Sequence, residues 1–309
     1  MKIIITGSLG NIGRPLTNSL VDQGHRVTVV SSDLKKGETI ESLGAIPAIG
    51  SIADVGFLTD ICKGADALFA MIPLSTREED ISVYLRQMAQ NYRQAIIKSG
   101  IRRVVLLSGW AADLTAGENI EDIFDGLDCS LTIMRPAIFY SNFFQYIPLI
   151  KGSGLMGKIL TMQHAGLGAL LKGRTGLIMG NYGAEDRVVF VSPRDIADVV
   201  AQQLVLYPEQ KTIYYVGSDE MTCNEAAGIL GRAIGKPWLK WVLLSDKKMK
   251  QGLRLSKVPE KLAETLIQMQ AAIHSGKALE HFHQRDNVLG RVKLVDFAKE
   301  FAEVYHRNP

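Results

Sequence analysis

Short apolar, β-branched runs alternate with helical patterns through the first half of the chain, and this alternation constrains the fold more than any other feature. The runs lie at residues 2–6, 26–30, 46–49, 67–72, 103–107 and 131–134, and the helical patterns at 15–24, 37–43, 55–62 and 82–99. Parallel strands joined through helices form right-handed crossovers. The pattern therefore predicts an α/β fold with a doubly wound parallel sheet.

Past Asn142 the alternation becomes irregular. Residues 151–183 are rich in Gly and Met without a clear period, which fits a helix followed by loops around a ligand. Strand patterns return at 188–191 and 212–216, and helical patterns at 192–206, 222–234, 259–275 and 295–305; Thr222 and Glu225 have capping-box spacing. We expect one domain over residues 1–150 and a smaller mixed α/β C-terminal lobe over 151–309 that packs on the sheet. Residues 188–216 are expected to return strands to that sheet.

The composition limits the classes of partner. The chain of 309 residues is 47% hydrophobic and 22% charged, which excludes disordered and collagen-like proteins. Lys and Arg number 35 against 32 Asp and Glu, without a run of five like charges, so we expect neither nucleic acid nor a membrane as partner. Cys62, Cys129 and Cys223 are odd in number and far apart, as in reduced proteins. Without a signal-peptide pattern or an apolar stretch long enough to span a bilayer, we expect a cytoplasmic protein, as a monomer or a homodimer.

Three glycines follow the first strand pattern directly and open the first helix, in the segment GSLGNIG at residues 7–13. In such a turn the first Gly permits the tight bend, the second lets the backbone approach a pyrophosphate, and the third lets the helix pack on the strand. The helix N-terminus supplies N–H donors for phosphates. The spacing is GxxGxxG rather than GxGxxG, and glycines there can serve packing alone. The strand–turn–helix context nevertheless favours an NAD(P)-binding Rossmann site, with Gly7, Leu9, Gly10, Asn11, Ile12 and Gly13 as its residues.

The end of the second strand bears on the choice of cofactor. NAD sites place an acidic residue there for the ribose 2′-hydroxyl, and NADP sites a basic one for the 2′-phosphate. Here Ser31 and Ser32 end the strand, and Lys35 and Lys36 follow. Asp33 is counter-evidence, and both lysines are also consistent with a solvated loop. The charges favour NADP(H) over NAD(H), with Ser31, Ser32 and Lys36 near the phosphate.

Several segments together resemble one family, the NmrA-like branch of the atypical short-chain dehydrogenases/reductases. They are GSLGNIGRPL from Gly7, HRVTVV from His25, GADALFAMIP from Gly64, RRVVLLSG from Arg102, LTIMRPAIFYSNF from Leu131, VFVSPRDIADVVA from Val189 and YYVGSDEMTCNEAAGILGRAIGK from Tyr214. The branch includes quinone reductases and redox-sensing regulators. The resemblance implies an adenine site at Ser51 and Ile52, but the family often has Arg at position 32 and Asp at position 51.

Related enzymes that reduce carbonyls use a Ser with a Tyr-x-x-x-Lys pair, in which the Lys lowers the phenol pKa so that the Tyr can protonate the carbonyl oxygen. Ser108, at the end of the fifth strand, has the position of the family Ser. Residues 109–135 contain neither Tyr nor Lys. The match Tyr207-Pro208-Glu209-Gln210-Lys211 is turn-like and is interpreted as chance. Ser108 is therefore either a catalytic-site contact to the nicotinamide or substrate, or a hydroxyl bonded within its turn.

A ligand pocket is expected where three strands end, because residues at carboxyl ends of parallel strands line the crevice of such folds. Its residues are Met71, Ile72 and Pro73, on the cofactor side, and Trp110, Phe139, Tyr140, Asn142 and Phe143 on the substrate side. The alternative is that these aromatic residues complete a core. His164 is a candidate proton donor or a simply exposed residue. His281 and His283, with His274 nearby, do not have metal-ligand spacing, so no metal is expected. A buried Arg135 has the position of a residue that ties the sheet to the lobe.

Two functions remain open. The first is an NAD(P)H-dependent oxidoreductase that transfers hydride to a quinone-like or other electron-poor acceptor without the Tyr and Lys, since the cofactor carries the chemistry. The second is a non-catalytic NAD(P)-binding redox sensor. The partner in either case is a small, aromatic or quinone-like molecule. A sugar-nucleotide epimerase is disfavoured, because it needs the Tyr and Lys.

Overall fold

Eight parallel strands form the central sheet of this computed structural model, which describes residues 1–73, 78, 80–114, 119–152 and 154–307. Their order is β13-β10-β6-β5-β4-β1-β2-β3. The strands are β1 (Lys2–Ile5), β2 (Arg26–Ser31), β3 (Ile46–Ile49), β4 (Ala67–Met71), β5 (Arg103–Leu107), β6 (Ser130–Pro136), β10 (Thr212–Gly217) and β13 (Asn287–Leu289). Strands β2 and β3 lie on one side of β1, and β4, β5 and β6 lie on the other. The position between β1 and β4 is therefore the switch point of the strand order, where ligands bind in such sheets.

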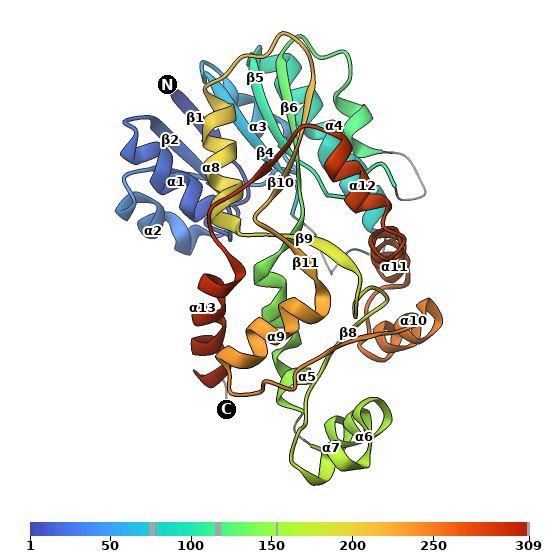
Figure 1. Cartoon of the computed structure of the whole chain (residues 1–309). Helices are drawn as coiled ribbons and strands as arrows, with labels where there is room; N and C mark the ends of the chain where they lie inside the picture. The colour runs from blue at the N-terminus through green and yellow to red at the C-terminus, as the bar shows by residue number, and fades with distance from the viewer. Residues whose placement is uncertain (74–77, 79, 115–118, 153, 308–309) are drawn as a thin grey trace.

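Helices cover both faces of this sheet (Figure 1). On one face α1 (Gly13–Asp22), α2 (Gly37–Ser42) and α8 (Pro193–Leu204) bury their apolar side chains against the sheet, and on the other α3 (Val55–Cys62) and α4 (Ile81–Ser99) do so. The side chains of β1, β4 and β5 alternate between the two cores, as the pleat requires. The predicted doubly wound α/β fold is confirmed.

Short strands and helices make up the C-terminal lobe. A three-stranded sheet joins β7 (Ile138–Phe139), β9 (Arg187–Val191) and β11 (Asp219–Thr222), and β8 (Ile178–Gly180) pairs with β12 (Trp241–Leu243). The helices are α5 (Ile147–Lys151), α6 (Gly154–Ala165), α7 (Leu167–Leu171), α9 (Cys223–Ala233), α10 (Asp246–Leu255), α11 (Glu260–His274), α12 (Lys277–Gln284) and α13 (Leu294–Arg307); η1 (Leu34–Lys36), η2 (Ile120–Phe124) and η3 (Tyr140–Tyr146) are 3₁₀ turns. The expected capping box is present: Thr222 and Glu225 exchange hydrogen bonds of 3.1 and 2.7 Å.

Residues 188–216 do not all return to the main sheet. β10 lies between β6 and β13, but β9 pairs antiparallel with β11 in the smaller sheet. The turn at Ser218 causes this, because it folds β11 back onto β9: the Ser218 N–H donates to Phe190 O at 2.7 Å, and Ser218 Oγ accepts from the Ser192 N–H at 2.9 Å. The division into domains at residue 150 stays a prediction.

Candidate functional site

The glycine turn between β1 and α1 requires glycine at two of its three positions. Gly7 has φ +90°, and a Cβ there would overlap the side chain of Met71. A Cβ on Gly13 would overlap the carbonyl oxygen of Ser8. The helix therefore begins in direct contact with the loop, whereas the sequence pattern predicted that this third glycine would bring the helix close to the strand.

Gly10 has a different environment, which fits a ligand. It is exposed, and a Cβ there would meet only the carbonyl oxygen of Gly7, at 3.4 Å. The helix behind it starts without a side-chain cap at Ile12. Uncapped N–H groups at a helix N-terminus and an open glycine backbone form a cradle for an anion such as a pyrophosphate. This geometry fits the dinucleotide that the motif predicts.

The two lysines that follow β2, Lys35 and Lys36, are available to contact a ligand. Ser31 is buried, and its Oγ lies 3.1 Å from Ser8 Oγ and accepts from the Asp33 N–H at 3.1 Å. The Asp33 carboxylate accepts from the Lys35 N–H at 3.0 Å and caps η1. Asp33 is thus occupied by its own turn. Ser32 and Lys35 are exposed, Lys36 is half-buried, and within the described part of the chain neither lysine has an ion-pair partner.

The loop after β3 is held by a residue that sequence analysis did not identify. Asn91 of α4 is buried and donates to the carbonyls of Ile52 and Ala53, both at 3.2 Å. Ser51 Oγ accepts from the Ala53 N–H at 3.1 Å. The half-buried Ile52 is therefore presented by a fixed loop. Nothing in the local sequence connects residue 91 with residue 52, so the sequence alone could not predict this contact.

The end of β4 is fixed by buried hydroxyls. Thr6 Oγ1 accepts from the Met71 N–H at 2.9 Å, and Tyr92 OH donates to Met71 O at 2.9 Å. Burial raises the pKa of Tyr92, so its hydroxyl stays a neutral donor. The side chains of Met71 and Ile72 are half-buried and Pro73 is exposed. This places the predicted cofactor-side residues beside the glycine turn, since Met71 lies against Gly7.

Ser108 bonds to a buried carboxylate. Its hydroxyl donates to Glu121 Oε1 at 2.5 Å. Arg135 binds the same carboxylate through two nitrogens, with Nε to Oε1 at 2.9 Å and Nη2 to Oε2 at 2.6 Å. Glu121 is 2% exposed and Arg135 is 3% exposed. The single proton of Ser108 is therefore directed into the protein, and its lone pairs are left for other donors.

The same arginine extends this network. Arg135 Nη1 lies 2.7 Å from Asp113 Oδ2 and 2.6 Å from Tyr215 OH, and its guanidinium lies 5.5 Å from the Tyr215 ring centroid. His281 Nδ1 of α12 lies 3.5 Å from Asp113 Oδ2. Burial alone would lower the pKa of Arg135, but its bonds to Glu121 and Asp113 raise it above the usual range. Arg135 thus connects β6 to η2, β10 and the segment after β5, which supports a structural role for this residue.

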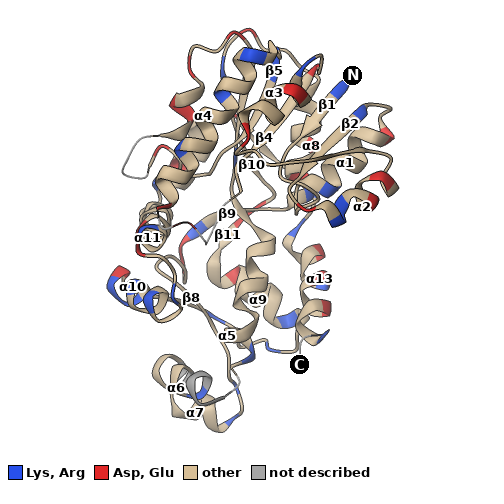
Figure 2. Cartoon of the chain, turned by 180° about the vertical axis from the view of Figure 1, so that it is seen from behind, with Lys and Arg blue, Asp and Glu red and all other residues tan. Residues whose placement is uncertain are grey.

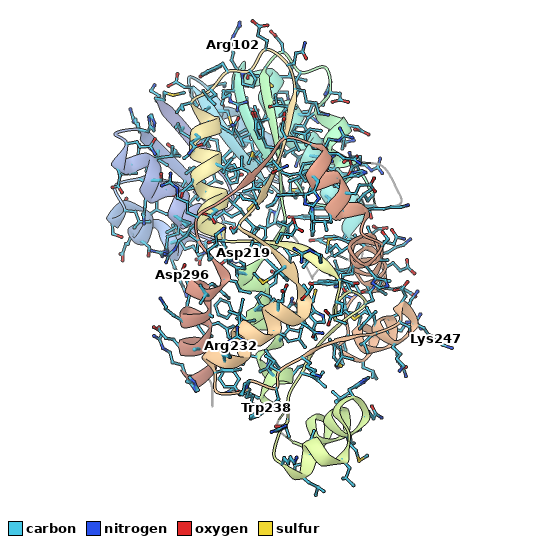
Figure 3. All side chains as sticks on the ribbon, in the orientation of Figure 1. Arg102, Asp219, Arg232, Trp238, Lys247 and Asp296 are labelled. Carbon is cyan, nitrogen blue, oxygen red and sulfur yellow. The ribbon has the colours of Figure 1, made fainter. Side chains whose placement is uncertain are left out.

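The aromatic residues expected in the substrate pocket have different environments. Tyr140 is fully buried: its hydroxyl donates to Asp219 Oδ2 at 2.7 Å in the middle of the molecule (Figure 3), and its ring stacks on Phe297. Phe143 packs between Phe190 and Trp241. This burial supports a core role for Tyr140 and Phe143.

The remaining pocket candidates lie nearer solvent or keep an unused donor. Phe139 is half-buried and Asn142 is exposed. Ser141 lies between them in the sequence, and its Oγ accepts from Asn11 of the glycine turn at 3.1 Å. Trp110 is buried, and its Nε1 has no hydrogen-bond partner among the described residues. His164 lies on α6, in the outer part of the lobe (Figure 1).

The other candidate motifs are separated by the fold. Tyr207 OH donates to Asp66 O, which precedes β4 and so lies at the amino ends of the strands, whereas Ser108 lies at their carboxyl ends. Lys211 pairs with Asp125 at 2.7 Å. His274 and His283 bond to Asp186 and Glu220, each at 2.8 Å. These two histidines therefore have separate carboxylate partners, whereas the buried Nδ1 of His281 has no hydrogen-bond partner among the described residues.

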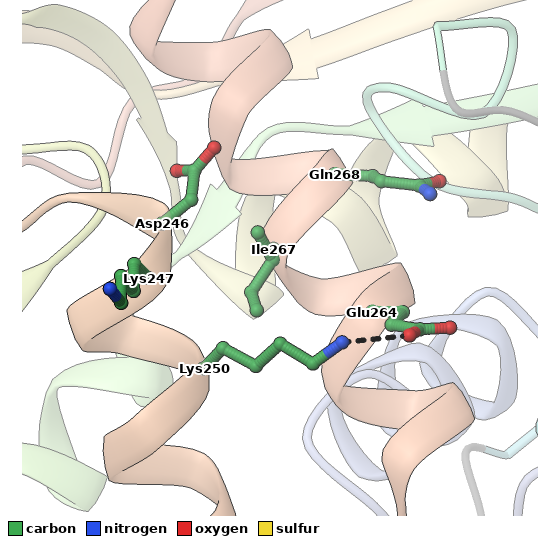
Figure 4. Close-up of a pocket in the computed structure, with 6 residues that line it drawn as sticks. All are labelled: Asp246, Lys247, Lys250, Glu264, Ile267 and Gln268. Atoms are coloured by element: carbon green, nitrogen blue, oxygen red, sulfur yellow. Dashed lines mark hydrogen bonds and ion pairs between the residues drawn. The ribbon is translucent and has the colours of Figure 1, made fainter.

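A cleft between α10 and α11 is lined by charged side chains and by Ile267 (Figure 4). Lys250 pairs with Glu264 at 2.9 Å across it. No residue of the glycine turn lines this cleft, so it is separate from the nucleotide cradle. Among the described helices, none combines the length and the apolar character needed to cross a bilayer.

Comparison with known proteins gives consistent findings. Residues 7–141 match the model of a family described as NAD(P)H-binding. The chain is 23% identical, over 98% of its length and 99% of the relative's, to (4-alkanoyl-5-oxo-2,5-dihydrofuran-3-yl)methyl phosphate reductase of Streptomyces griseus.

Two solved structures share the fold. One is the NADPH-dependent quinone oxidoreductase QOR2 of Escherichia coli in complex with NADPH, with TM-score 0.71, 16% identity, and coverage of 97% of this chain and 99% of that one. The other is the triphenylmethane reductase of a Citrobacter species, with TM-score 0.72, 17% identity, and coverage of 98% and 100%. Residues 7–141 of this chain are therefore similar to the NAD(P)H-binding family, and the whole chain shares its fold with these structures, which agrees with the predicted resemblance to an NAD(P)-binding Rossmann protein.

Proposed function

We propose that this protein is an NADPH-dependent oxidoreductase of the NmrA-like type that reduces a quinone-like or other electron-poor acceptor. The observation that carries the proposal is the combination of an open cradle at Gly10 with a Ser108 whose proton is bonded to Glu121. The cradle suits a dinucleotide, and the orientation of Ser108 limits the chemistry that can follow.

The cofactor would be bound by residues that follow the carboxyl ends of β1, β2 and β3. Gly7, Gly10 and the start of α1 would bind the pyrophosphate, and Ile52 would contact the adenine. Ser32, Lys35 and Lys36 are open to a 2′-phosphate, because Asp33 is occupied in capping η1. When bound, the nicotinamide supplies the hydride. The protein's own part is to position the ring against the acceptor and to exclude water.

The acceptor class follows from the missing acid. A simple ketone gains a localised negative charge as hydride arrives, so it needs a positioned proton donor. Ser108 already donates to Glu121, and residues 109–135 hold neither Tyr nor Lys. A quinone or another conjugated acceptor spreads this charge and can take its proton from water. Phe139, Asn142 and Trp110 remain the proposed contacts for such a ligand, with Ser108 accepting a hydrogen bond from the cofactor or the ligand.

The test is steady-state NADPH oxidation with a panel of quinones, enones and simple ketones. We expect turnover with quinones or enones and little with ketones. Gly10→Val should abolish NADPH binding, measured by fluorescence titration, while the fold stays intact, because a side chain there has space in the unliganded protein. Unchanged binding in a folded Gly10→Val protein would refute the site. Efficient ketone reduction would refute the acceptor class.

A non-catalytic redox sensor is the second candidate. The bonding of Ser108 into the Glu121–Arg135 network favours it, because this network provides stability without any proton transfer. Tight NADPH binding without oxidation by any acceptor of the panel would support the sensor and exclude the reductase. Binding of NADPH and NADP⁺ with different affinities would then be the expected signature.

A further inference from the structure

The α6–α7 hairpin, made of helices Gly154–Ala165 and Leu167–Leu171, projects from the C-terminal lobe, away from the central sheet (Figure 1). Its base is closed by Lys236, whose Nζ donates to the carbonyls of Ile150 at 2.7 Å, Lys151 at 3.2 Å and Thr175 at 3.1 Å. Gly176 lies so close to Ile150 that a Cβ would overlap its carbonyl oxygen. Trp238 lies nearby, beside the base of the hairpin (Figure 3). The two helices pack mainly against each other, so their outer surface lacks a partner in the described part of the chain.

The charged side chains of the hairpin and its base are all positive. Residues 151–184 contain Lys151, Lys158, Lys172 and Arg174 but no Asp or Glu. Figure 2 accordingly shows no acidic residue on α6 or α7. The whole chain has 35 Lys and Arg against 32 Asp and Glu, so these four residues account for its excess of positive charge. Lys158 and Lys172 are exposed, and no described residue forms an ion pair with them.

Large apolar side chains are exposed between these cations. Met162 is 47% exposed, Leu167 59% and Leu171 78%. Leu167 and Leu171 are four residues apart on α7, so they lie on one side of that helix. Exposed Leu and Met flanked by Lys and Arg, without acidic residues, is the composition of segments that lie in a membrane interface.

We propose that the α6–α7 hairpin docks on the surface of an anionic phospholipid bilayer. Leu167 and Leu171 would enter the boundary between headgroups and acyl chains, and Lys158 and Lys172 would contact phosphates. A second copy of the chain is a poorer occupant, because a symmetric contact would bring the same cations together without an acidic residue of the hairpin to pair with them. The proposal departs from the expectation, based on the charge of the whole chain, that a membrane is not a partner. The net charge of the whole chain does not show that several cations lie together on this hairpin. The proposal requires no spanning helix.

The test is co-sedimentation of the full chain with vesicles of phosphatidylcholine alone or with phosphatidylserine added. We expect binding only to the phosphatidylserine vesicles, weakening as salt is raised. Leu167→Glu/Leu171→Glu should lower the partition coefficient at least about tenfold, and Lys158→Glu/Lys172→Glu by a similar factor. Leu255→Glu is the matched control, since Leu255 on α10 is also 78% exposed, and Lys247→Glu on α10 is the charge control. Both controls should bind as the wild type does.

Absence of binding to anionic vesicles at low salt would overturn the proposal. So would equal losses in the hairpin variants and in the controls. If analytical ultracentrifugation instead gave a dimer that dissociates in Leu167→Glu/Leu171→Glu, without vesicle binding, the surface would be an interface between copies. The readout is vesicle binding and not turnover, so this inference stands or falls separately from the proposed reductase activity. Unchanged NADPH binding in each variant shows that the fold is kept.

Discussion

Individual side chains of the candidate site were only partly predictable from the sequence. The motif identified Ser108 and Arg135, and a buried arginine requires a carboxylate partner. Six acidic residues lie between them, however, and nothing in the local pattern distinguishes Glu121 from the other five. The choice depends on how η2 folds back on β5 and β6, which is a tertiary property. The same holds for Asn91, whose contact with Ile52 joins α4 to a distant loop.

The Glu121–Arg135 pair should be strongly coupled. Glu121→Ala leaves a buried guanidinium with only Asp113 as a charged partner, so we expect the free energy of unfolding to fall by roughly 3 to 5 kcal/mol. Glu121→Ala/Arg135→Met should recover part of that loss, because no unpaired buried charge remains. Urea unfolding of both variants and of Arg135→Met measures the coupling. Additive losses in the double variant would show that the two groups act independently.

Substitutions of Gly13 and Gly10 in the turn should have different effects, one on stability and the other on cofactor binding. Gly13→Ala should cost about 1 to 3 kcal/mol of stability, because the new methyl group overlaps the Ser8 carbonyl. Gly10→Ala should change stability by less than about 0.5 kcal/mol, since only Gly7 O is near, and yet weaken NADPH binding. Thermal unfolding with and without NADPH separates the two effects. A stable Gly13→Ala protein would contradict the geometry of the turn.

At the scale of elements, the predicted bounds of helices and strands agree best with the structure where residues at both ends of an element mark its start and its stop. The bounds of α3 and β5 agree with the sequence pattern: Asp54 caps α3, and Gly100, at φ +68°, ends the helix before β5. The elements α10, α12 and β13 were not predicted. β13 has only three residues, too few for a periodic pattern, and it forms because β10 offers a parallel partner. α10 has only three large apolar residues, Met249, Leu253 and Leu255, and it buries none of them fully.

The turn after β2 carries the prediction on cofactor choice. Lys35→Glu/Lys36→Glu should weaken NADPH binding at least about tenfold and NADH binding much less, because a lost charge-assisted phosphate bond costs roughly 1.5 to 3 kcal/mol. Isothermal titration with both cofactors provides the comparison. Lys247→Glu/Lys248→Glu on α10, where both lysines are exposed, is the matched control. Equal losses for NADPH and NADH would mean that these lysines do not contact the 2′-phosphate.

At the scale of the whole molecule, the last part of the chain links the two halves. β13 joins the main sheet beside β10, and α13 packs on η3 and α9 in the lobe. Between them, the N–H groups of Arg291 and Val292 donate to the buried Asp195 carboxylate, at 3.0 and 3.1 Å to its nearer oxygens, and Ser218 Oγ donates at 2.5 Å. The sequence predicted a C-terminal lobe packed on the sheet, but this long-range anchor has no signature in either segment.

Gly290 tests whether this anchor holds the molecule together. A Cβ there would overlap the Asp195 carboxylate, so Gly290→Ala must displace either the carboxylate or the chain leading to α13. We expect a loss of about 1 to 3 kcal/mol in unfolding free energy, with faster amide exchange in residues 294–307 than in α1. Gly252→Ala is the control in the same lobe, because a Cβ there has no neighbour within 4 Å and alanine favours the α10 helix. If both variants keep wild-type stability and exchange, Asp195 does not fix the C-terminal segment; if only Gly290→Ala loosens α13, this single carboxylate couples the end of the chain to both halves.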